Sequence, residues 1–295
     1  VTVRVSGAAG RATVSRPPLA LTADVLELNG WEFGDEDDWP MDSWLQGAVC
    51  AAPNTCTEVD YPADEGEEGA QQGAKVLAQS LAGTSGKVVY TYSAGGSAAT
   101  YWLQNDAGKS GQPGPDQVAF VMVADPHSAK GGAVTALGLG SATPVNSGYT
   151  VIQVAQEYDG VADYPTNTWN WLADANAIAG YLQLHPDYSN VDLYSPDNLV
   201  AESGATTYVL TPTQDLPLLQ PLRSIGLTQL ADALNGPLKA YIDTAYNRTG
   251  YAPMTPADVT HIQSVIGGSV GATSPAAKTM MAVANSVPEP SSAVT

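Results

Sequence analysis

The segment from Lys87 to Leu103 constrains the fold of this chain more than any other. Its first six residues, Lys-Val-Val-Tyr-Thr-Tyr, have the composition of a buried strand, and they lead through Ser93-Ala-Gly-Gly directly into a helix start. A chain that passes from a strand straight into a helix needs small residues there, because the two backbones approach each other closely. The pattern predicts a strand at 87–92, a sharp turn at Ser93 and a helix from residue 97, with the serine above the carboxyl edge of a sheet.

Other apolar segments alternate with helical segments along the chain. Continuous apolar strands are typical of a parallel sheet that is covered on both faces. The alternation predicts an α/β fold with a mostly parallel central sheet and helices on both faces. We expect strands at 24–30, 57–62, 117–124, 150–155 and 206–210, and helices at 43–49, 67–82, 168–182, 227–245 and 256–266.

The length and composition fit one large folded domain with flexible ends. The 295 residues, 44% of them hydrophobic, provide enough apolar surface for a sizeable core. We expect an N-terminal arm at 1–21 with one short strand at Val3–Val5, a folded domain at 22–270, and a tail of mostly Pro, Ser, Ala and Val at 271–295.

The charge excludes several classes of partner. The chain has 30 acidic against 11 basic residues, a formal net charge of −19. Nucleic-acid phosphates and anionic lipid surfaces would repel most of such a molecule. No stretch approaches the ~18 consecutive apolar residues that a membrane-spanning helix requires. We therefore expect a soluble protein that binds neither nucleic acid nor the interior of a membrane. The sequence does not indicate an oligomeric state, and a monomer is the default expectation.

The two cysteines indicate the compartment. Cys50 and Cys56 flank a Pro/Asn turn, which favours a disulfide between them over the alternative of two unrelated thiols. Two cysteines without a nearby histidine cannot fill a zinc shell. The chain starts at Val1 without a basic, apolar leader, so we expect it to begin after a removed signal peptide or at an artificial boundary. A disulfide and a missing start methionine favour a secreted or cell-envelope protein.

An acidic cluster follows the first predicted core strand. Five acidic residues lie between Glu32 and Asp38, which raises the question of a calcium site. Their spacing matches no EF-hand pattern, so a solvated acidic loop is the preferred interpretation. We expect no metal and no cofactor.

The turn at Ser93 has the chemistry of an activated nucleophile. The run from Thr91 to Gly95 matches the Gly-x-Ser-x-Gly elbow except that Thr91 replaces the first glycine. The amide of Ala94 and the positive end of the following helix point at the same place, which suits an oxyanion. The alternative is a buried serine in a tight turn.

A nucleophilic serine needs a histidine and an acid within hydrogen-bond reach. His185 follows a helix late in the chain, where the hydrolase order of serine, acid and histidine predicts the base. His127 comes early for that order, and His261 lies on a late helix, so both rank behind His185.

The acid should stand at the end of a strand between Ser93 and His185. Asp159 comes first after an apolar strand, and Asp163 is held in reserve. Asp125 ends the preceding strand, where a structural role explains it equally well. The order Ser93, Asp159, His185 satisfies the template of a serine hydrolase.

Three segments together resemble a known family. They are Thr91–Gly95, Tyr158–Pro165, and the helix Asn170–Gly180 that leads to His185-Pro-Asp-Tyr, and they look like the PE-PPE domain of actinobacteria over roughly residues 21–251. The resemblance implies a cutinase-related serine α/β-hydrolase with esterase activity on acyl esters and, in some members, acyl transfer in glycolipid assembly. It places the triad on Ser93, Asp159 or Asp163, and His185.

The resemblance also indicates further site residues. A second oxyanion amide falls on Gly30, Trp31 or Glu32, of which we select Trp31 beside Ala94. We expect Tyr92 and Trp169 to contact substrate, although core packing of an amphipathic helix explains Trp169 and Trp171 as well. The glycine-rich segment at 127–149 suits a lid-like insertion beside an acyl pocket, or a plain surface loop.

These patterns predict a serine esterase or lipase that cleaves carboxylic esters through an acyl-enzyme and acts on an ester or lipid substrate, in the manner of a cutinase or polyester hydrolase. One alternative is an acyltransferase that moves acyl groups between glycolipids. Another is a non-catalytic binding protein on a hydrolase scaffold, which fold alone does not exclude.

Overall fold

A computed structural model describes residues 23–31, 40–63, 66–167 and 169–268 of the chain. The predicted N-terminal arm with its strand at 3–5, the acidic loop at 32–38 and the tail at 271–295 lie outside the described residues. The boundaries proposed for these parts remain predictions.

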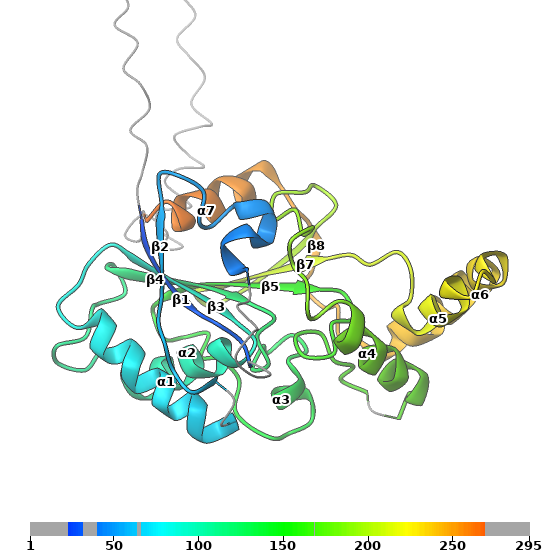
Figure 1. Ribbon diagram of the computed structural model, residues 1–295, viewed down its shortest axis with the longest axis horizontal. Helices are drawn as coiled ribbons and strands as arrows, with labels where there is room; N and C mark the ends of the chain where they lie inside the picture. The colour runs from blue at the N-terminus through cyan, green and yellow to red at the C-terminus, as the bar shows by residue number, and fades with distance from the viewer. Residues whose placement is uncertain (1–22, 32–39, 64–65, 168, 269–295) are drawn as a thin grey trace, which may run out of the picture.

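An eight-stranded sheet forms the centre of the molecule (Figure 1). The first six strands across the sheet are parallel, and the last two make antiparallel pairs, so the prediction of a mostly parallel sheet is confirmed. In spatial order the strands are β2 (Thr55–Glu58), β1 (Asp24–Leu28), β3 (Lys87–Tyr92), β4 (Val118–Val123), β5 (Thr150–Gln156), β7 (Thr206–Thr211), β6 (Leu199–Ser203) and β8 (Ala252–Pro253).

The strand order reverses beside β1. The chain passes from β1 outward to β2 and then returns to the other side of β1 with β3, before it continues to β4 and β5. Open α/β sheets bind ligands at the carboxyl ends of the strands that flank such a reversal. Residues 29–31 follow β1 and Ser93 follows β3, so both lie at this point.

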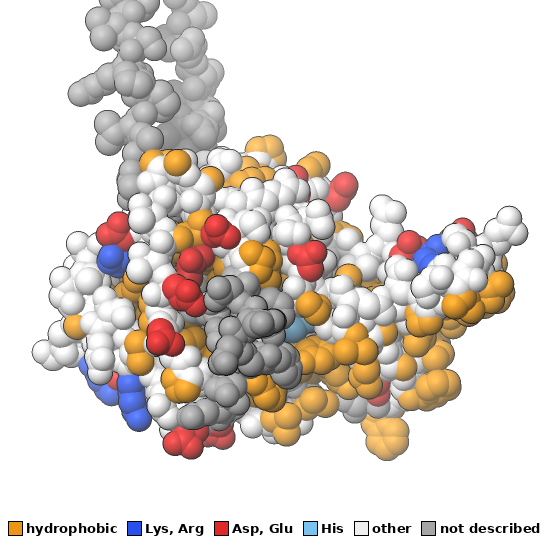
Figure 2. Space-filling view, viewed as in Figure 1, with side chains coloured by type: hydrophobic (Ala, Val, Ile, Leu, Met, Phe, Trp, Pro, Cys, Tyr) orange, Lys and Arg blue, Asp and Glu red, His pale blue; other side chains and the backbone are white. Residues whose placement is uncertain are grey.

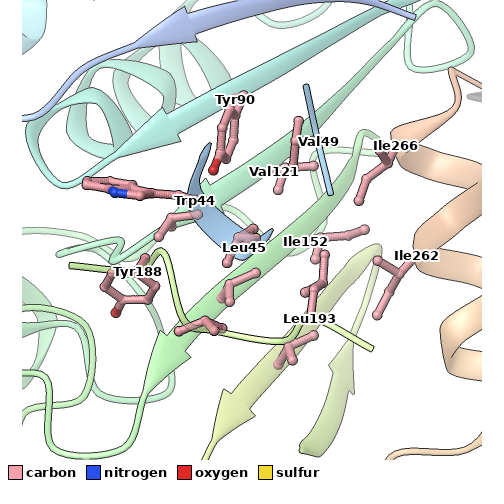
Figure 3. Close-up of a cluster of buried hydrophobic side chains, with 14 of the residues drawn as sticks. Trp44, Leu45, Val49, Tyr90, Val121, Ile152, Tyr188, Leu193, Ile262 and Ile266 are labelled. Atoms are coloured by element: carbon pink, nitrogen blue, oxygen red, sulfur yellow. The ribbon is translucent and has the colours of Figure 1, made fainter. Parts of the chain in front are cut away.

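Helices cover both faces of the sheet (Figure 1). On one face, α1 (Gly66–Leu81) and α2 (Ala94–Asn105) pack through Leu77, Leu81 and Trp102 onto the sheet. On the other face lie the 3-10 element η1 (Met41–Gly47) and α7 (Pro256–Ile266). Figure 3 shows side chains of both elements, with Tyr188, closing over the strands. This three-layer arrangement is the α/β-hydrolase fold that the sequence predicts.

A group of helices at one end of the sheet has its own small core (Figure 1). Residues of this core include Ala173, Leu216, Leu219 and Ile242. The group contains α4 (Trp171–Gln183), η3 (Pro217–Leu219), α5 (Gln220–Ser224), α6 (Thr228–Ile242) and η4 (Asp243–Ala245). The short helix α3 (Ala133–Ala136) lies in the segment between β4 and β5.

Several predicted elements differ from the observed ones. The helix expected at 43–49 is wrong, because Leu45 and Gln46 have left-handed backbone angles and their amides donate to the carbonyls of Tyr188 and Ser189. The strand expected at 57–62 lies at 55–58, and the helix expected at 168–182 begins at Trp171. The elements β6, β8, α3 and α5 were not predicted.

The predicted disulfide between Cys50 and Cys56 is present, with the two Cα atoms 5.6 Å apart. It ties the loop after η1 to the start of β2. Among the described residues, no helix combines the length and apolar character that crossing a membrane requires.

Candidate active site

Ser93 lies at a strained turn between β3 and α2. Its backbone angles are φ 49° and ψ −111°, in a region that non-glycine residues rarely adopt. The turn is tight because α2 begins against the end of β1: a Cβ atom on Gly95 would collide with the carbonyl oxygen of Leu28 and lie 3.0 Å from that of Asn29. Thr91 fits where the elbow motif has glycine because this residue is still an ordinary strand position.

The structure brings His185 to the serine. Its Nε2 atom lies 3.0 Å from Ser93 Oγ. His185 follows the C-terminus of α4, where its amide donates to the carbonyl of Gly180. The hydroxyl of Tyr92 donates to the His185 carbonyl at 2.8 Å, and the two rings lie 5.0 Å apart. The backbone and the ring of the histidine are therefore both supported.

Asp159 completes the arrangement from the end of β5. Both its carboxylate oxygens lie 3.0 Å from His185 Nδ1. The hydroxyl of Tyr188 donates to it at 2.6 Å and the amide of Val161 at 2.8 Å. Burial alone would raise the pKa of Asp159, but the charge of His185 and these hydrogen bonds outweigh burial and lower the pKa below its usual value.

Asp163, the reserve candidate, has different partners. Its carboxylate accepts two hydrogen bonds from the guanidinium of Arg248, at 2.5 and 2.7 Å, and one from the amide of Tyr158. Its own amide donates to the carbonyl of Asp159. Asp163 therefore clamps the turn that carries Asp159, and its hydrogen-bond partners are Arg248 and the backbone of that turn.

The other candidates have other hydrogen-bond partners. His127 Nδ1 pairs with the carbonyl of Ser141, and His261 Nε2 lies 3.4 Å from Thr207 Oγ1 on β7. Asp125 is buried after β4, where it accepts hydrogen bonds from Thr143 and Gln153. Burial raises the pKa of Asp125. These contacts indicate structural roles for the three residues.

The backbone beside Ser93 offers two candidate oxyanion donors. Ala94 is the first residue of α2, so its amide has no partner within that helix. A Cβ atom on Gly30 would lie 3.3 Å from Ser93 Cβ, so the loop that carries Gly30 and Trp31 runs alongside the serine. Tyr61 anchors this loop, since its hydroxyl donates to the carbonyl of Asn29 at 2.6 Å. Glu32 lies outside the described residues.

Ser93 opens into a cavity of about 640 Å³. The segment between β4 and β5 lies along it, and the hydrogen bond from the Thr143 amide to the His127 carbonyl anchors that segment. Whether it acts as a lid or is a surface loop stays a prediction. Most of the lining side chains are apolar, which suits an acyl chain; among them are Trp31, Ala70, Pro126, Val134, Leu139 and Val161.

The two predicted substrate contacts lie outside this lining. Tyr92 is buried behind His185, so its side chain supports the histidine. Trp169 is 93% exposed and Trp171 70% exposed, which rules out the core-packing alternative for both. Neither tryptophan lines the cavity that contains Ser93.

Sequence reasoning missed the residues that hold the site in place. Tyr61 and Arg248 act through partners that are distant along the chain, and no local pattern marks them. Tyr188 belongs to the run that starts at His185, but its contact with Asp159, 29 residues earlier, is not visible in the sequence. Among the described residues, the one acidic and sulfur-containing group with the spacing of metal ligands is Glu27 with Cys50 and Cys56. The sulfur atoms of those cysteines form the disulfide, so this group does not suit a metal.

Comparisons with known proteins identify relatives of this chain. The chain is 35% identical over 232 residues to Esterase PE16 of Mycobacterium tuberculosis, a match that covers 69% of this chain and 43% of that protein. It is 32% identical over 158 residues to Diacyltrehalose acyltransferase Chp2 of the same organism, covering 46% of this chain and 44% of that protein. The chain thus spans less than half the length of these curated relatives.

A solved structure of a cutinase-like protein from Cryptococcus sp. is also similar, with a TM-score of 0.36 and 15% identity over 48% of this chain and 79% of that one. The model of the PE-PPE domain matches residues 53–247, well over half of the sequence. By this match, the chain belongs to the PE-PPE domain family.

Proposed function

We propose that this protein hydrolyses carboxylic acyl esters through a covalent intermediate on Ser93. The observation that carries the proposal is the chain of contacts from Ser93 Oγ to His185 Nε2, at 3.0 Å, and from His185 Nδ1 to the buried carboxylate of Asp159. A serine, a histidine and an acid in this order activate the serine hydroxyl. The relative named as an esterase supports the same reaction class.

The geometry supports a two-step mechanism. In the first step His185 Nε2 takes the proton of Ser93 Oγ as the oxygen attacks the ester carbonyl carbon. Asp159 holds the proton on Nδ1 and stabilises the imidazolium that forms. His185 then gives its proton to the alcohol oxygen, the bond from carbon to that oxygen breaks, and the acyl group remains on Ser93.

In the second step water replaces the alcohol. His185 takes a proton from the water as its oxygen attacks the acyl-enzyme, and it returns that proton to Ser93 Oγ when the acid leaves. In both steps the carbonyl oxygen carries negative charge in the tetrahedral state. The amide of Ala94 and an amide of the loop at Gly30 and Trp31 are the proposed donors to that oxygen.

The proposal is tested with p-nitrophenyl esters from acetate to palmitate. We expect the wild type to hydrolyse part of this series and Ser93→Ala to lose at least about 10³-fold in kcat. Ser203→Ala, an exposed serine on β6, is the matched control and should keep full activity. A wild type without activity on every ester, or an active Ser93→Ala protein, would contradict the mechanism.

Acyl transfer to an alcohol is the second candidate, because the chain also resembles a diacyltrehalose acyltransferase. The acyl-enzyme would be the same, and an alcohol would replace water in the second step. Trapping the acyl-enzyme with increasing concentrations of a sugar alcohol separates the two. Ester product that exceeds free acid at millimolar alcohol would favour transfer.

A non-catalytic role is tested on the same protein with a serine-reactive phosphonate. Labelling of the folded wild type at Ser93 supports an activated serine, and failure to label it favours a binding protein.

We further propose a monomeric protein located outside the cytoplasm. The disulfide between Cys50 and Cys56 fits an oxidising compartment. Fractionation of cells that carry the full-length protein tests the location, and a cytoplasmic pool with free thiols would contradict it.

A further inference from the structure

Helix α4 buries small residues and exposes large apolar ones, the opposite of a typical surface helix. Its inner side consists of small residues such as Ala173, Ala177 and Gly180, while Trp171, Ile178 and Leu182 point into solvent at 70%, 58% and 68% exposure. A surface helix normally buries its large apolar side chains and exposes polar ones. The close packing is required on the inner side, because a Cβ atom on Gly180 would collide with the carbonyl of Tyr158. This packing explains the small residues of the buried side but not the large apolar residues of the exposed side.

The neighbouring helix α6 continues the apolar surface. Leu227, Leu230, Leu234 and Tyr241 recur at helical spacing and are 37% to 50% exposed. In Figure 2 hydrophobic side chains extend over α4 and along the lower edge of the α5–α6 projection. Exposed apolar patches of this kind mark interaction sites. We call these residues, with those of α4, the α4–α6 face.

Helix α4 connects the α4–α6 face to the active site. Helix α4 leads directly to His185, whose ring lies 5.5 Å from that of Tyr181. Leu139 and Trp31, at 74% and 49% exposure, are further exposed apolar residues, and both line the cavity that contains Ser93. An occupant of the face would thus lie at the entrance to the cavity.

The charged residues near the α4–α6 face indicate which kind of partner can bind there. Helix α4 contains no lysine or arginine. Near α6, Arg223 pairs with Asp215 and Asp232, and Lys239 pairs with Glu157, so the cations of this region are already neutralised. With a net charge of −19, the molecule would be repelled by anionic lipid. A second copy of the chain would bring the same charge and would cover the opening of the cavity.

We propose that the α4–α6 face docks onto the surface of an uncharged acyl-lipid phase, from which the ester enters the cavity at Ser93. The inference rests on the proposed ester hydrolysis and adds the physical state of the substrate. Trp171 and Leu182 insert their side chains among acyl chains, and no bond is made or broken in docking.

The test measures binding apart from turnover. Ser93→Ala protein is mixed with triolein droplets and, separately, with vesicles of phosphatidylcholine and of phosphatidylglycerol, and the bound fraction is measured after flotation. We expect binding to triolein, and at least tenfold weaker binding to phosphatidylglycerol. In the same background, Trp171→Ser/Ile178→Ser/Leu182→Ser should reduce triolein binding at least tenfold.

A matched control replaces three exposed residues of α1, as Glu68→Ser/Lys75→Ser/Gln79→Ser, and should bind triolein like its parent. With Ser93 restored, both triple variants should hydrolyse soluble p-nitrophenyl acetate within about twofold of the wild type. Leu230→Ser/Leu234→Ser on α6 provides an independent weakening of the face if the α4 variant does not fold.

Three results would overturn the docking proposal: triolein binding that survives both sets of serine substitutions, stronger binding to phosphatidylglycerol, or a dimer in size-exclusion chromatography that the α4 variant dissociates. The last would assign the face to a second copy. An inactive wild type that still binds droplets would instead remove ester hydrolysis while leaving docking in place.

Discussion

Two carboxylates four residues apart have different partners in this site. Asp159 contacts the histidine that reaches Ser93, while Asp163 pairs with Arg248 and holds the backbone of the same turn. Both are buried, and both follow the same strand. Burial and position after the strand therefore do not distinguish Asp159 from Asp163. Only the partner of each carboxylate identifies Asp159 as the proposed acid.

Substitution of each aspartate by asparagine should separate activity from stability. Asp159→Asn should lower kcat by about 10³-fold or more, because the amide no longer holds the correct tautomer of His185. Asp163→Asn should cost about 1–3 kcal/mol of unfolding free energy, because Arg248 loses the closer of its two carboxylate partners, and should reduce activity by less than about tenfold. Kinetics and urea unfolding of both variants check this. A larger loss of activity in Asp163→Asn would reverse the assignment.

Glu27 on β1 should make stability depend on pH. Burial, with the nearby charges of Asp42 and Glu58, raises the pKa of Glu27 to about 7 from a usual value of 4.5. The folded protein therefore binds more protons than the unfolded chain between these values, so this group lowers stability as the pH rises from 4.5 through 7.

Glu27→Gln should consequently raise the melting temperature by ~2–4 °C at pH 8 and leave it nearly unchanged at pH 4. Thermal unfolding from pH 4 to 8 measures the effect, with Glu68→Gln on the exposed side of α1 as the control. A gain that is equal at both pH values would disprove the linkage.

At the scale of elements, small residues set the distance between α1 and α2. The buried side of α1 contains Gly69, Ala70, Gly73 and Ala74, and α2 opposes it with Ala98. A Cβ atom on Gly73 would lie 2.6 Å from the ring of Tyr61 and 2.8 Å from Ala98 Cβ. This contact matters for the site, because α2 begins at Ala94 and Tyr61 anchors the loop at Asn29.

Gly73→Leu should therefore destabilise the protein by about 1–3 kcal/mol, because the helix must move away from α2. Lys75→Leu adds the same side chain on the exposed side of α1 and should change stability by less than about 0.5 kcal/mol. Chemical denaturation of the two variants compares them directly. Equal stabilities would show that the helices tolerate the added volume.

For the whole molecule, the excess of acidic residues governs its response to salt. A net charge of −19 disfavours the compact state through self-repulsion, and salt screens that repulsion. The charge leaves the proposed chemistry untouched, because Ser93, His185 and Asp159 act at hydrogen-bond distance.

Raising sodium chloride from 20 to 500 mM at pH 8 should increase the melting temperature by ~2–5 °C. The increase should shrink at pH 5, where carboxylates begin to be protonated and the net charge is smaller. Differential scanning fluorimetry at both pH values measures it. A melting temperature that falls with salt would mean that attractive ion pairs outweigh the net repulsion.

Local signals in the sequence determined the framework of this protein. The apolar runs predict β3, β4 and β5 almost to the residue, and the small residues after Ser93 predict the turn from strand to helix. The order of Ser93, Asp159 and His185 along the chain also selects the residues that the fold brings together. These features depend on neighbours in sequence, which is why they can be read there.

Only the tertiary structure decided the features that depend on distant partners. The short strand β8 forms one edge of the sheet and β6 lies beside it, and neither has a strong apolar pattern. Tyr188 reaches Asp159 only because η1 and its neighbours pack over the sheet. The sequence also did not reveal that the side chains of Trp169 and Trp171 are exposed. A helical pattern of apolar residues marks a side that can be buried, but which side is covered depends on what packs against it, and that is set by the rest of the fold.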